Sequence, residues 1–435
     1  MNLIRKIKVY NIYFDVEIVD SLRAFAIVSI IFLWPEKFYV DNVSISLNYL
    51  IFPIVFILFK SYLQDIVLFL MLSLLLYLLL IMQVFSGVYF NTIFKSIIYI
   101  PIFSFLIVFC YSFIKEIFKN NDEIKIVKFL KLFLLLQLLL MIGQLLLWSM
   151  GYRITWHMAT FAYIHDGLPR PCGFFLEPSN LGFSLSPFLY ILFVNFKKFV
   201  KWFGYSSIFI LATIFFLSFS LTFLGALVLS FIYKGISLTN RLNNKNVLKK
   251  FMIFLIGIIS IFFLAQSVRP IAIRLNQVIF RIEGREKING KINMSSAVFL
   301  KGFEMAKKAL ESYPIGVGID NLQFLNKFTH IAKLGGNYFK ENKDSGGSVL
   351  WKIIGEFGYF GLFIAFGTFS FMIYRVLKDK KNERNILIEA FMFALIVSFL
   401  RSPGYTNGVD IIGLSILFWF FLKNIRKCVL VKGLN

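Results

Sequence analysis

The sequence is divided into apolar blocks about as long as a membrane-spanning helix, separated by stretches that carry most of its charge. A helix needs about 20 consecutive apolar residues to cross the roughly 30 Å hydrocarbon core of a bilayer. The chain is 58% hydrophobic and 16% charged, whereas soluble domains are roughly 45–50% apolar and about 25% charged. We therefore predict an all-α polytopic membrane protein.

The blocks predict about twelve transmembrane helices. Their predicted ranges are 21–34, 45–59, 62–82, 93–114, 129–150, 179–196, 205–220, 222–236, 251–268, 349–374, 386–400 and 411–422. The chain contains no internal repeat and no low-complexity linker. Residues 1–435 are therefore expected to form a single integral membrane domain.

The distribution of Lys and Arg predicts the side of each loop, because cytoplasmic loops collect basic residues. If the N-terminus is cytoplasmic, so are the basic clusters at 5–8, 115–128, 197–201, 241–250, 375–384 and 423–432. The short opposite loops then keep Lys37, Arg153, Arg170 and Arg401, with Lys95 at a helix end. We predict a multi-pass protein of the cytoplasmic (inner) membrane with both termini in the cytoplasm. Since topology explains much of the net charge of +23, no nucleic-acid partner is expected.

Two longer segments face the outside in this topology, a smaller loop at 151–178 and a large loop at 268–348. The large loop holds thirteen Lys and Arg against seven Asp and Glu. Long loops escape the positive-inside rule, so topology does not explain this excess of positive charge. The histidines His157, His165 and His330 also lie in these two loops. We therefore expect the functional chemistry on the outer face.

The smaller loop ends in a segment that starts at Arg170 and leads into a predicted span. Pro178 suits a first helical turn, which Ser179 or Asn180 can cap. Arg170 and Glu177 would be costly to bury unpaired at the membrane surface. They form either an interfacial salt bridge, or an anion-binding Arg beside a carboxylate that acts as a base.

Four arginines open the large loop, namely Arg269, Arg274, Arg281 and Arg285. On an α-helix Arg281 and Arg285 each lie within about 20° of the direction of Arg274, so the last three form one cationic face. This face would belong to an interfacial amphipathic helix that binds anionic membrane lipids. Alternatively, it would form a clamp for phosphate, which guanidinium groups bind bidentately.

The rest of the large loop is expected to be partly helical. Apolar residues at helical spacing predict a helix over 295–313. The segment Pro314–Gly318 would end this helix in a tight turn, and the span predicted at 349–374 contains the segment Glu356–Gly361.

Taken in the order in which they occur along the chain, several of these segments resemble those of the superfamily of the Wzy-type O-antigen polymerases and the O-antigen ligases. The matching segments are Arg170–Asn180, Ser218–Thr222, Arg281 with Arg285, Pro314–Gly318 and Glu356–Gly361. The resemblance covers roughly residues 140–370 and rests on the order and topology of the segments. It implies a GT-C-like fold.

The resemblance also implies a glycosyltransferase that polymerises a surface polysaccharide, such as O-antigen lipopolysaccharide or capsule, at the outer face of the membrane. The growing glycan would leave its polyprenyl-diphosphate (undecaprenyl-type) carrier and pass to a sugar hydroxyl of another carrier-linked repeat unit. Because the donor brings its own diphosphate leaving group, no cofactor is expected. The expected partners are carrier-linked oligosaccharides as donor and acceptor, membrane lipids, a chain-length regulator and a flippase.

Such a reaction needs cations that hold the diphosphate and a base that takes the hydroxyl proton. The outer loops offer arginines and no His, Asp and Glu cluster at metal spacing, so we expect arginine and no metal. The expected catalytic residues are Arg170, Glu177, Arg281 and Arg285. The expected substrate-binding residues are Arg153, Arg269, Arg274, His330 and Arg401.

The sequence departs from the ligase pattern at one place. Ligases of the superfamily carry a His eleven residues before the first Gly of a Gly-x-x-Gly, here Gly358, and this chain has Gly347 there. His330 lies seventeen residues too early. Polymerases vary more at this place, so a polymerase is the leading interpretation and a ligase the first alternative. A flippase or other secondary transporter and an envelope scaffold are further alternatives.

The predicted topology can be tested by labelling single cysteines from either side of the membrane. Sites near Asp166 and Lys333 should react from the outside, and sites near Lys245 and Lys380 from the inside, because the basic clusters mark the cytoplasmic loops. Labelling of the Lys333 and Lys380 sites from the same side would contradict this topology.

Overall fold

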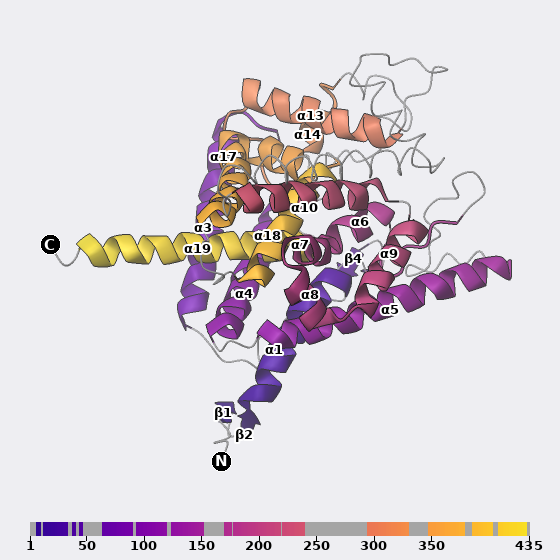
Figure 1. Cartoon of the computed structure of the whole chain (residues 1–435). Coiled ribbons are helices and arrows are strands. Elements are labelled where there is room, and N and C mark those ends of the chain that lie inside the picture. Colours follow the sequence, from indigo (N-terminus) through magenta and orange to yellow (C-terminus); the bar gives the residue numbers. More distant parts are fainter. Residues whose placement is uncertain are drawn as a thin grey trace.

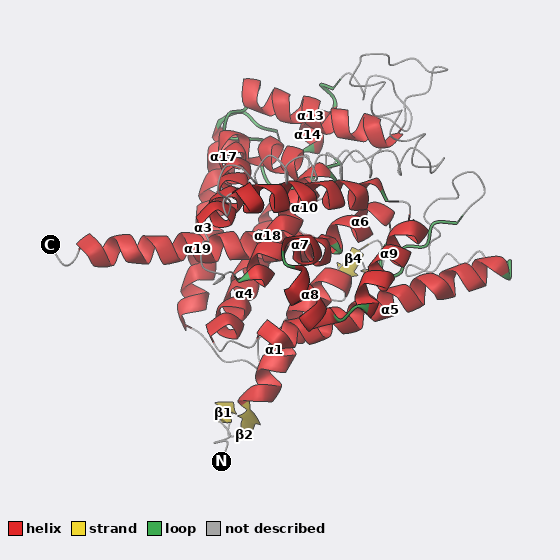
Figure 2. Ribbon diagram, viewed as in Figure 1, coloured by secondary structure: helices red, strands yellow, loops and turns green. Residues whose placement is uncertain are grey.

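The computed structural model describes residues 6–9, 12–33, 37–40, 43–46, 63–89, 93–119, 123–151, 169–175, 177–218, 220–239, 294–329, 347–378, 385–402 and 408–432. In this part of the chain the protein is a body of packed helices (Figures 1 and 2). The predicted helical class is therefore confirmed, with one addition, a pair of short β-hairpins near the N-terminus.

The two hairpins flank helix α1 (Val16–Leu33). Strand β1 (Lys6–Val9) pairs antiparallel with β2 (Ile12–Asp15), and β3 (Lys37–Val40) pairs antiparallel with β4 (Val43–Ser46). The span predicted at 45–59 begins inside β4. The sequence-based prediction missed the hairpins because it searched for apolar blocks, whereas these strands are short runs rich in β-branched and aromatic residues.

Most predicted spans correspond to helices of the structure. These helices are α1, α3 (Leu63–Phe85), α4 (Ile93–Lys119), α5 (Glu123–Ser149), α9 (Ser206–Ser218), α10 (Leu221–Thr239), α17 (Val349–Lys378), α18 (Ile386–Leu400) and α19 (Gly408–Lys432). The others described are α6 (Pro178–Ser184), α7 (Ser186–Val194), α8 (Phe196–Phe203), α13 (Met294–Ser312) and α14 (Gln323–Asn326). Helix α13 confirms the helix predicted at 295–313.

Four described helices are each long and apolar enough to cross a membrane alone. They cover Asp65–Phe85, Ser96–Lys119, Glu123–Ser149 and Val349–Arg375. Helices α8 and α9 meet at a bend of 98° and would make a fifth span together, and Thr222–Gly235 and Ile386–Leu400 are shorter apolar helices. The predicted span 251–268, and 45–59 beyond β4, lie outside the described residues. The total of about twelve spans stays a prediction.

The span predicted at 179–196 is divided into two helices. Helix α6 ends at Ser184, Leu185 caps both helices, and α7 begins at Ser186. Pro187 lies in the first turn of α7, where its missing N–H breaks no helical hydrogen bond. Apolar composition alone did not reveal this break, because both short helices are almost entirely buried.

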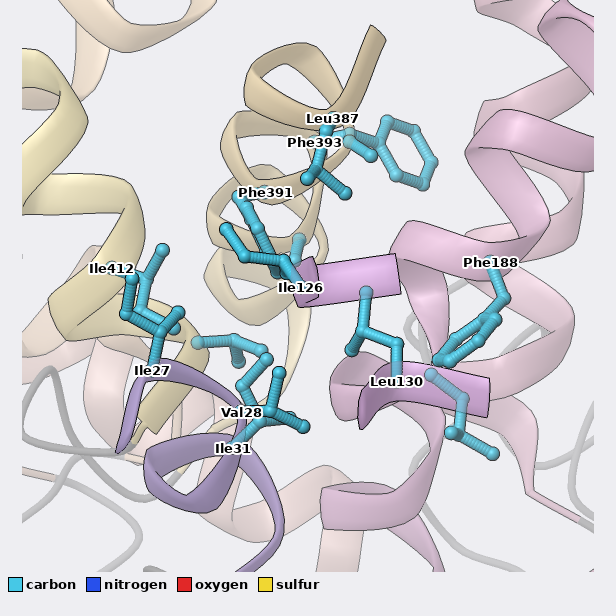
Figure 3. Packing of buried hydrophobic residues seen from close by; sticks show 14 of the residues in the cluster. Ile27, Val28, Ile31, Ile126, Leu130, Phe188, Leu387, Phe391, Phe393 and Ile412 are labelled. Carbon is cyan, nitrogen blue, oxygen red and sulfur yellow. The ribbon is translucent and has the colours of Figure 1, made fainter. Parts of the chain in front are cut away.

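Helix α18 lies at the centre of the largest hydrophobic core. Its side chains are buried from Ile386 to Phe399, as expected for a helix that is apolar on all sides. Figure 3 shows side chains of α1, α5, α7 and α19 directed into this core together with those of α18, for example Ile31, Leu130 and Phe188.

Large apolar side chains also cover the outer surface of several helices. On α3, Leu70, Met71 and Leu74 are more than half exposed, and on α17 Phe363 and Phe366 are 73% and 70% exposed. An apolar surface of this extent would promote aggregation in water but suits contact with lipid chains. The protein is therefore a membrane-embedded helical protein.

Helix ends that the charge pattern assigns to one side of the membrane lie together. Among the predicted cytoplasmic ends, Nζ of Lys198 lies 3.9 Å from Oε1 of Glu123, and Nζ of Lys234 donates a 2.9 Å hydrogen bond to the Val194 carbonyl. Among the predicted outer ends, Gly408 packs against the carbonyl of Ile30. The contacts agree with the predicted grouping of the ends, and which side faces the cytoplasm stays a prediction.

Candidate functional site

Arg170 joins two segments that are far apart in the sequence. Its side chain is 4% exposed, and its Nε donates a 3.0 Å hydrogen bond to the carbonyl of Ser218. Ser218 is the last residue of α9, so the arginine binds the C-terminal end of that helix. Two of the segments that carry the resemblance, Arg170–Asn180 and Ser218–Thr222, are thus in direct contact.

Two buried glutamines of α5 bind the backbone that follows Arg170. Gln144 Oε1 accepts hydrogen bonds of 3.0 Å from the amides of Cys172 and Gly173, and its Nε2 donates to the Gly173 carbonyl at 3.2 Å. Gln137 Nε2 donates to the Cys172 carbonyl at 2.9 Å, and its Oε1 accepts from the Phe174 amide at 3.0 Å. The two glutamine side chains therefore provide the hydrogen-bonding partners that this non-helical backbone would otherwise lack inside a membrane.

Glu177 lies at the N-cap of α6, with Pro178 as the first helical residue as predicted. The predicted caps, Ser179 and Asn180, instead lie inside the first turn. The Glu177 carboxylate is half-buried and accepts a 2.9 Å hydrogen bond from the Ser179 hydroxyl. The ion pairs found in the described part of the chain do not include one between Arg170 and Glu177. The predicted interfacial salt bridge is therefore not how this segment is held.

Helix α6 packs closely on the start of α10. A methyl group added to Gly182 would lie 2.6 Å from the amide nitrogen of Phe223 and 2.9 Å from Oγ of Ser220. In Figure 1, α10 crosses the middle of the molecule, where it contacts α6, α7, α17 and α18. The Arg170 segment is thereby connected to the second half of the chain.

Helix α17 breaks at Gly358, and the turn after α13 fills the break. Gly358 has φ 59° and ψ −135°. The Gly355 carbonyl accepts from the Val317 amide at 3.1 Å, and the Tyr359 amide donates to the Pro314 carbonyl at 2.9 Å. Pro314–Gly318 and Glu356–Gly361, two further segments of the resemblance, are thus also in contact. We call this contact the Gly358 junction.

Side chains of α3 and α4 complete the Gly358 junction. Gln83, which is 1% exposed, donates hydrogen bonds of 3.0 Å to the carbonyls of Ile315 and Glu356. Ser96 donates a 2.6 Å hydrogen bond to the carbonyl of Ile319. The backbone carbonyls of the turn and of the broken helix are therefore bound by side chains from two neighbouring helices.

A buried charge cluster lies beside the junction. Nζ of Lys352 is 3.6 Å from Oδ1 of Asp320 and 3.5 Å from Oε1 of Glu356. The Glu356 side chain is fully buried, and those of Lys352 and Asp320 are 11% and 13% exposed. Since a buried charge is tolerated only when paired, Lys352 binds the large loop to α17. Asp320 has φ 58°, a left-handed conformation that Asp tolerates better than most residues.

Arg401 lies close to both α10 and the start of α17. It is half-buried, and a methyl group added to Gly347 would lie 3.5 Å from its Nη1. Its neighbour Leu400 packs against α10, since a methyl group on Gly225 would lie 3.4 Å from Leu400 Cδ1. Gly225 is about one helical turn from the start of α10, the end that contacts the Arg170 segment. Arg170 and Arg401 therefore lie at the same end of α10.

The other predicted site residues lie outside the described residues. These are Arg153, Arg269, Arg274, Arg281, Arg285 and His330. The described part of the chain contains no group of three or more His, Cys, Asp and Glu side chains placed to bind a metal. The expectation that arginine replaces metal stays a prediction.

The sequence analysis missed the glutamines Gln83, Gln137 and Gln144, and the Lys352 cluster. The glutamines gave a usable signal, because an amide side chain inside an apolar span needs a hydrogen-bonding partner. The spacing of four residues between Lys352 and Glu356 is also that of a helical ion pair. Their partners on other segments could not be identified from the sequence, because these contacts depend on the tertiary fold.

No family model matches this chain, and a search of curated proteins finds no match.

The Gly358 junction predicts an unequal effect of two alanine substitutions in α17. In Gly358→Ala, the new methyl group would collide with the Pro314 carbonyl, and the backbone conformation disfavours a side chain by about 1–3 kcal/mol. We expect a lower unfolding temperature in detergent and a smaller yield of folded protein. Gly367→Ala is the matched control, because nothing lies within 4 Å of its new methyl group. Equal stability of the two variants would contradict the junction.

Proposed function

We propose that the protein is a polymerase of surface polysaccharide repeat units. It transfers the growing glycan from a polyprenyl-diphosphate carrier to a sugar hydroxyl of another carrier-linked repeat unit, at the outer face of the cytoplasmic membrane. The observation that carries the proposal is the pairing of the segments that resemble the O-antigen polymerases. Arg170–Asn180 contacts Ser218–Thr222, and Pro314–Gly318 contacts Glu356–Gly361.

The proposal is supported by two arginines, Arg170 and Arg401, which lie at the same end of α10. The acceptor hydroxyl attacks the anomeric carbon, the bond from that carbon to the diphosphate oxygen breaks, and the diphosphate leaves with the electron pair. Arg170 and Arg401 are the described residues proposed to neutralise the leaving diphosphate. Arg153, Arg269, Arg274, Arg281 and Arg285, which lie outside the described residues, are expected to share this role. Glu177 is the proposed acceptor of the hydroxyl proton.

The surroundings of Gly347 argue against the ligase alternative. This is the position at which ligases of the resembling superfamily carry a His. Gly347 has φ 70°, and any side chain there would collide with Cγ1 of Val298. A His at this place would require the backbone and α13 to move apart. The polymerase interpretation needs no side chain at this position.

The break in α17 is the observation that most favours the transporter alternative. Transporters bind substrates and ions with the exposed backbone groups of broken helices. At Gly358, however, the carbonyls before the break accept hydrogen bonds from Val317, Gly318 and Gln83. The Tyr359 amide after the break donates to the Pro314 carbonyl. The break thus connects the large loop to α17, which favours an enzyme with a fixed outer structure over a transporter.

The proposal is tested by incubating the purified protein in lipid with a carrier-linked oligosaccharide. A polymerase lengthens the glycan on the carrier, whereas a flippase moves the carrier across the bilayer without lengthening the glycan. Arg170→Ala should slow chain growth by about a hundredfold or more, as for the loss of other preorganised charged donors. Arg170→Lys should recover part of this loss, because a point charge does not reproduce the planar guanidinium.

The control for Arg170 is Lys307→Ala, at an exposed lysine on α13 that pairs with Glu311. This variant should extend the glycan at the normal rate. Because Arg170 also binds the end of α9, the unfolding temperature of each variant is measured alongside. Full chain growth by a folded Arg170→Ala protein would remove Arg170 from the proposed site.

Glu177 is tested by its effect on the rate of chain growth. If it accepts the hydroxyl proton, Glu177→Gln should slow the reaction by about a hundredfold or more, because an amide cannot take the proton. Glu177→Asp keeps a carboxylate and should retain part of the rate. An unchanged rate in a folded Glu177→Gln protein would mean that Glu177 acts only at the N-terminus of α6.

A further inference from the structure

Helix α8 has two faces of different chemistry. Phe199 and Phe203 are fully buried, and the Phe203 ring lies 5.1 Å from that of Phe188 in α7. On the opposite face, Lys197 and Lys201 are exposed and lie four residues apart, on neighbouring turns. This short helix is therefore packed on the protein by aromatic side chains and presents lysines outward.

Exposed aromatic rings flank the two lysines. Phe196 is 49% exposed and Tyr205 is 64% exposed, and their ring centroids are 6.4 Å apart. Aromatic rings beside lysines are typical of the boundary between lipid chains and headgroups, where the rings contact the chains and the ammonium groups reach the phosphates. The exposed face of α8 has the composition of an interfacial surface.

The chain changes direction sharply directly after α8. Gly204 ends the helix with φ 84°, and α9 leaves at 98° to α8. The exposed rings of α9, such as Phe209 at 74% exposure, lie beyond this bend. If α9 runs into the bilayer, a helix at nearly a right angle to it lies along the membrane surface. The bend thus places α8 in the plane of the interface.

The third lysine of α8 connects it to α5. Nζ of Lys198 lies 3.9 Å from Oε1 of Glu123 and 4.4 Å from the centre of the Trp202 ring. On α5, Lys128 and Lys131 are also exposed. Since Lys198 is the lysine of α8 that pairs with Glu123, Lys197 and Lys201 carry the positive charge that α8 presents outward.

We propose that α8 lies in the headgroup region of the cytoplasmic leaflet and that Lys197 and Lys201 bind the phosphates of anionic phospholipids. The charges of the surface complement those of the headgroups, and the exposed Phe196 and Tyr205 insert beside them. The assignment to the cytoplasmic leaflet follows from the basic cluster at 197–201. The proposal is independent of the polymerase proposal.

The test compares the full-length protein in nanodiscs of phosphatidylcholine alone and of phosphatidylcholine with phosphatidylglycerol. Phosphatidylglycerol should raise the unfolding temperature of the unmodified protein, and 0.5 M salt should reduce this rise because it screens exposed charges. The double variant Lys197→Gln with Lys201→Gln should lose at least half of the rise. The control Lys307→Gln with Lys308→Gln removes two lysines of α13 and should retain it.

A second measurement locates the helix itself. A spin label on Tyr205→Cys should report a depth at the headgroup boundary in both kinds of nanodisc. A label fully in water, or a double variant that keeps the whole rise with phosphatidylglycerol, overturns the proposal. If the label on α8 is in water and the unfolding temperature does not depend on the lipid, this surface would instead bind a soluble acidic partner.

Discussion

Peptide groups that leave a helix inside a membrane find no water, so each must bind another group of the protein. An unsatisfied buried peptide group costs roughly 2–7 kcal/mol, which is a large part of the stability of a domain. Here Gln83, Gln137 and Gln144 meet this requirement at two places, the backbone after Arg170 and the Gly358 junction. The remaining arrangement of the outer segments depends on these bonds.

The same requirement decides which segments meet. The broken α17 leaves the Gly355 and Glu356 carbonyls without helical donors, and the amides of Val317 and Gly318 replace those donors at 3.1 and 3.0 Å. The large loop is therefore joined to a membrane helix through the backbone, with the Lys352 ion pairs beside it. A junction built in this way holds the segment Pro314–Gly318 at a fixed position relative to α17, as the proposed substrate site would require.

Apolar block length predicted the positions of most helices, because length and composition determine whether a segment can cross a bilayer. It failed where breaks occur inside apolar sequence, as between α6 and α7 and at Gly358. At Gly358 the partners of the break come from the distant segment Pro314–Gly318, so the sequence of the span does not reveal them. For the candidate site, the sequence identified Arg170 and Glu177 as neighbours in one segment but not their actual partners, Ser218 and Ser179. The Ser218 partner depends on the tertiary fold, which brings the end of α9 to the Arg170 segment.

Two of the buried carboxylates in the described part of the chain lie in surroundings that differ from those of Arg170. Asp65 and Glu389 lie in the first turns of their helices, where the helix dipole stabilises a carboxylate, and each accepts a hydrogen bond from a hydroxyl group. Arg170 is different, because it reaches the C-terminal end of α9 from a non-helical segment. A guanidinium carries five N–H donors in one plane, and the bond from Nε to Ser218 fixes the direction of that plane. Electrostatic stabilisation of a leaving diphosphate requires a cation that is already oriented before the reaction. The bond that completes the end of α9 therefore also restrains the guanidinium of Arg170, as its proposed role would require.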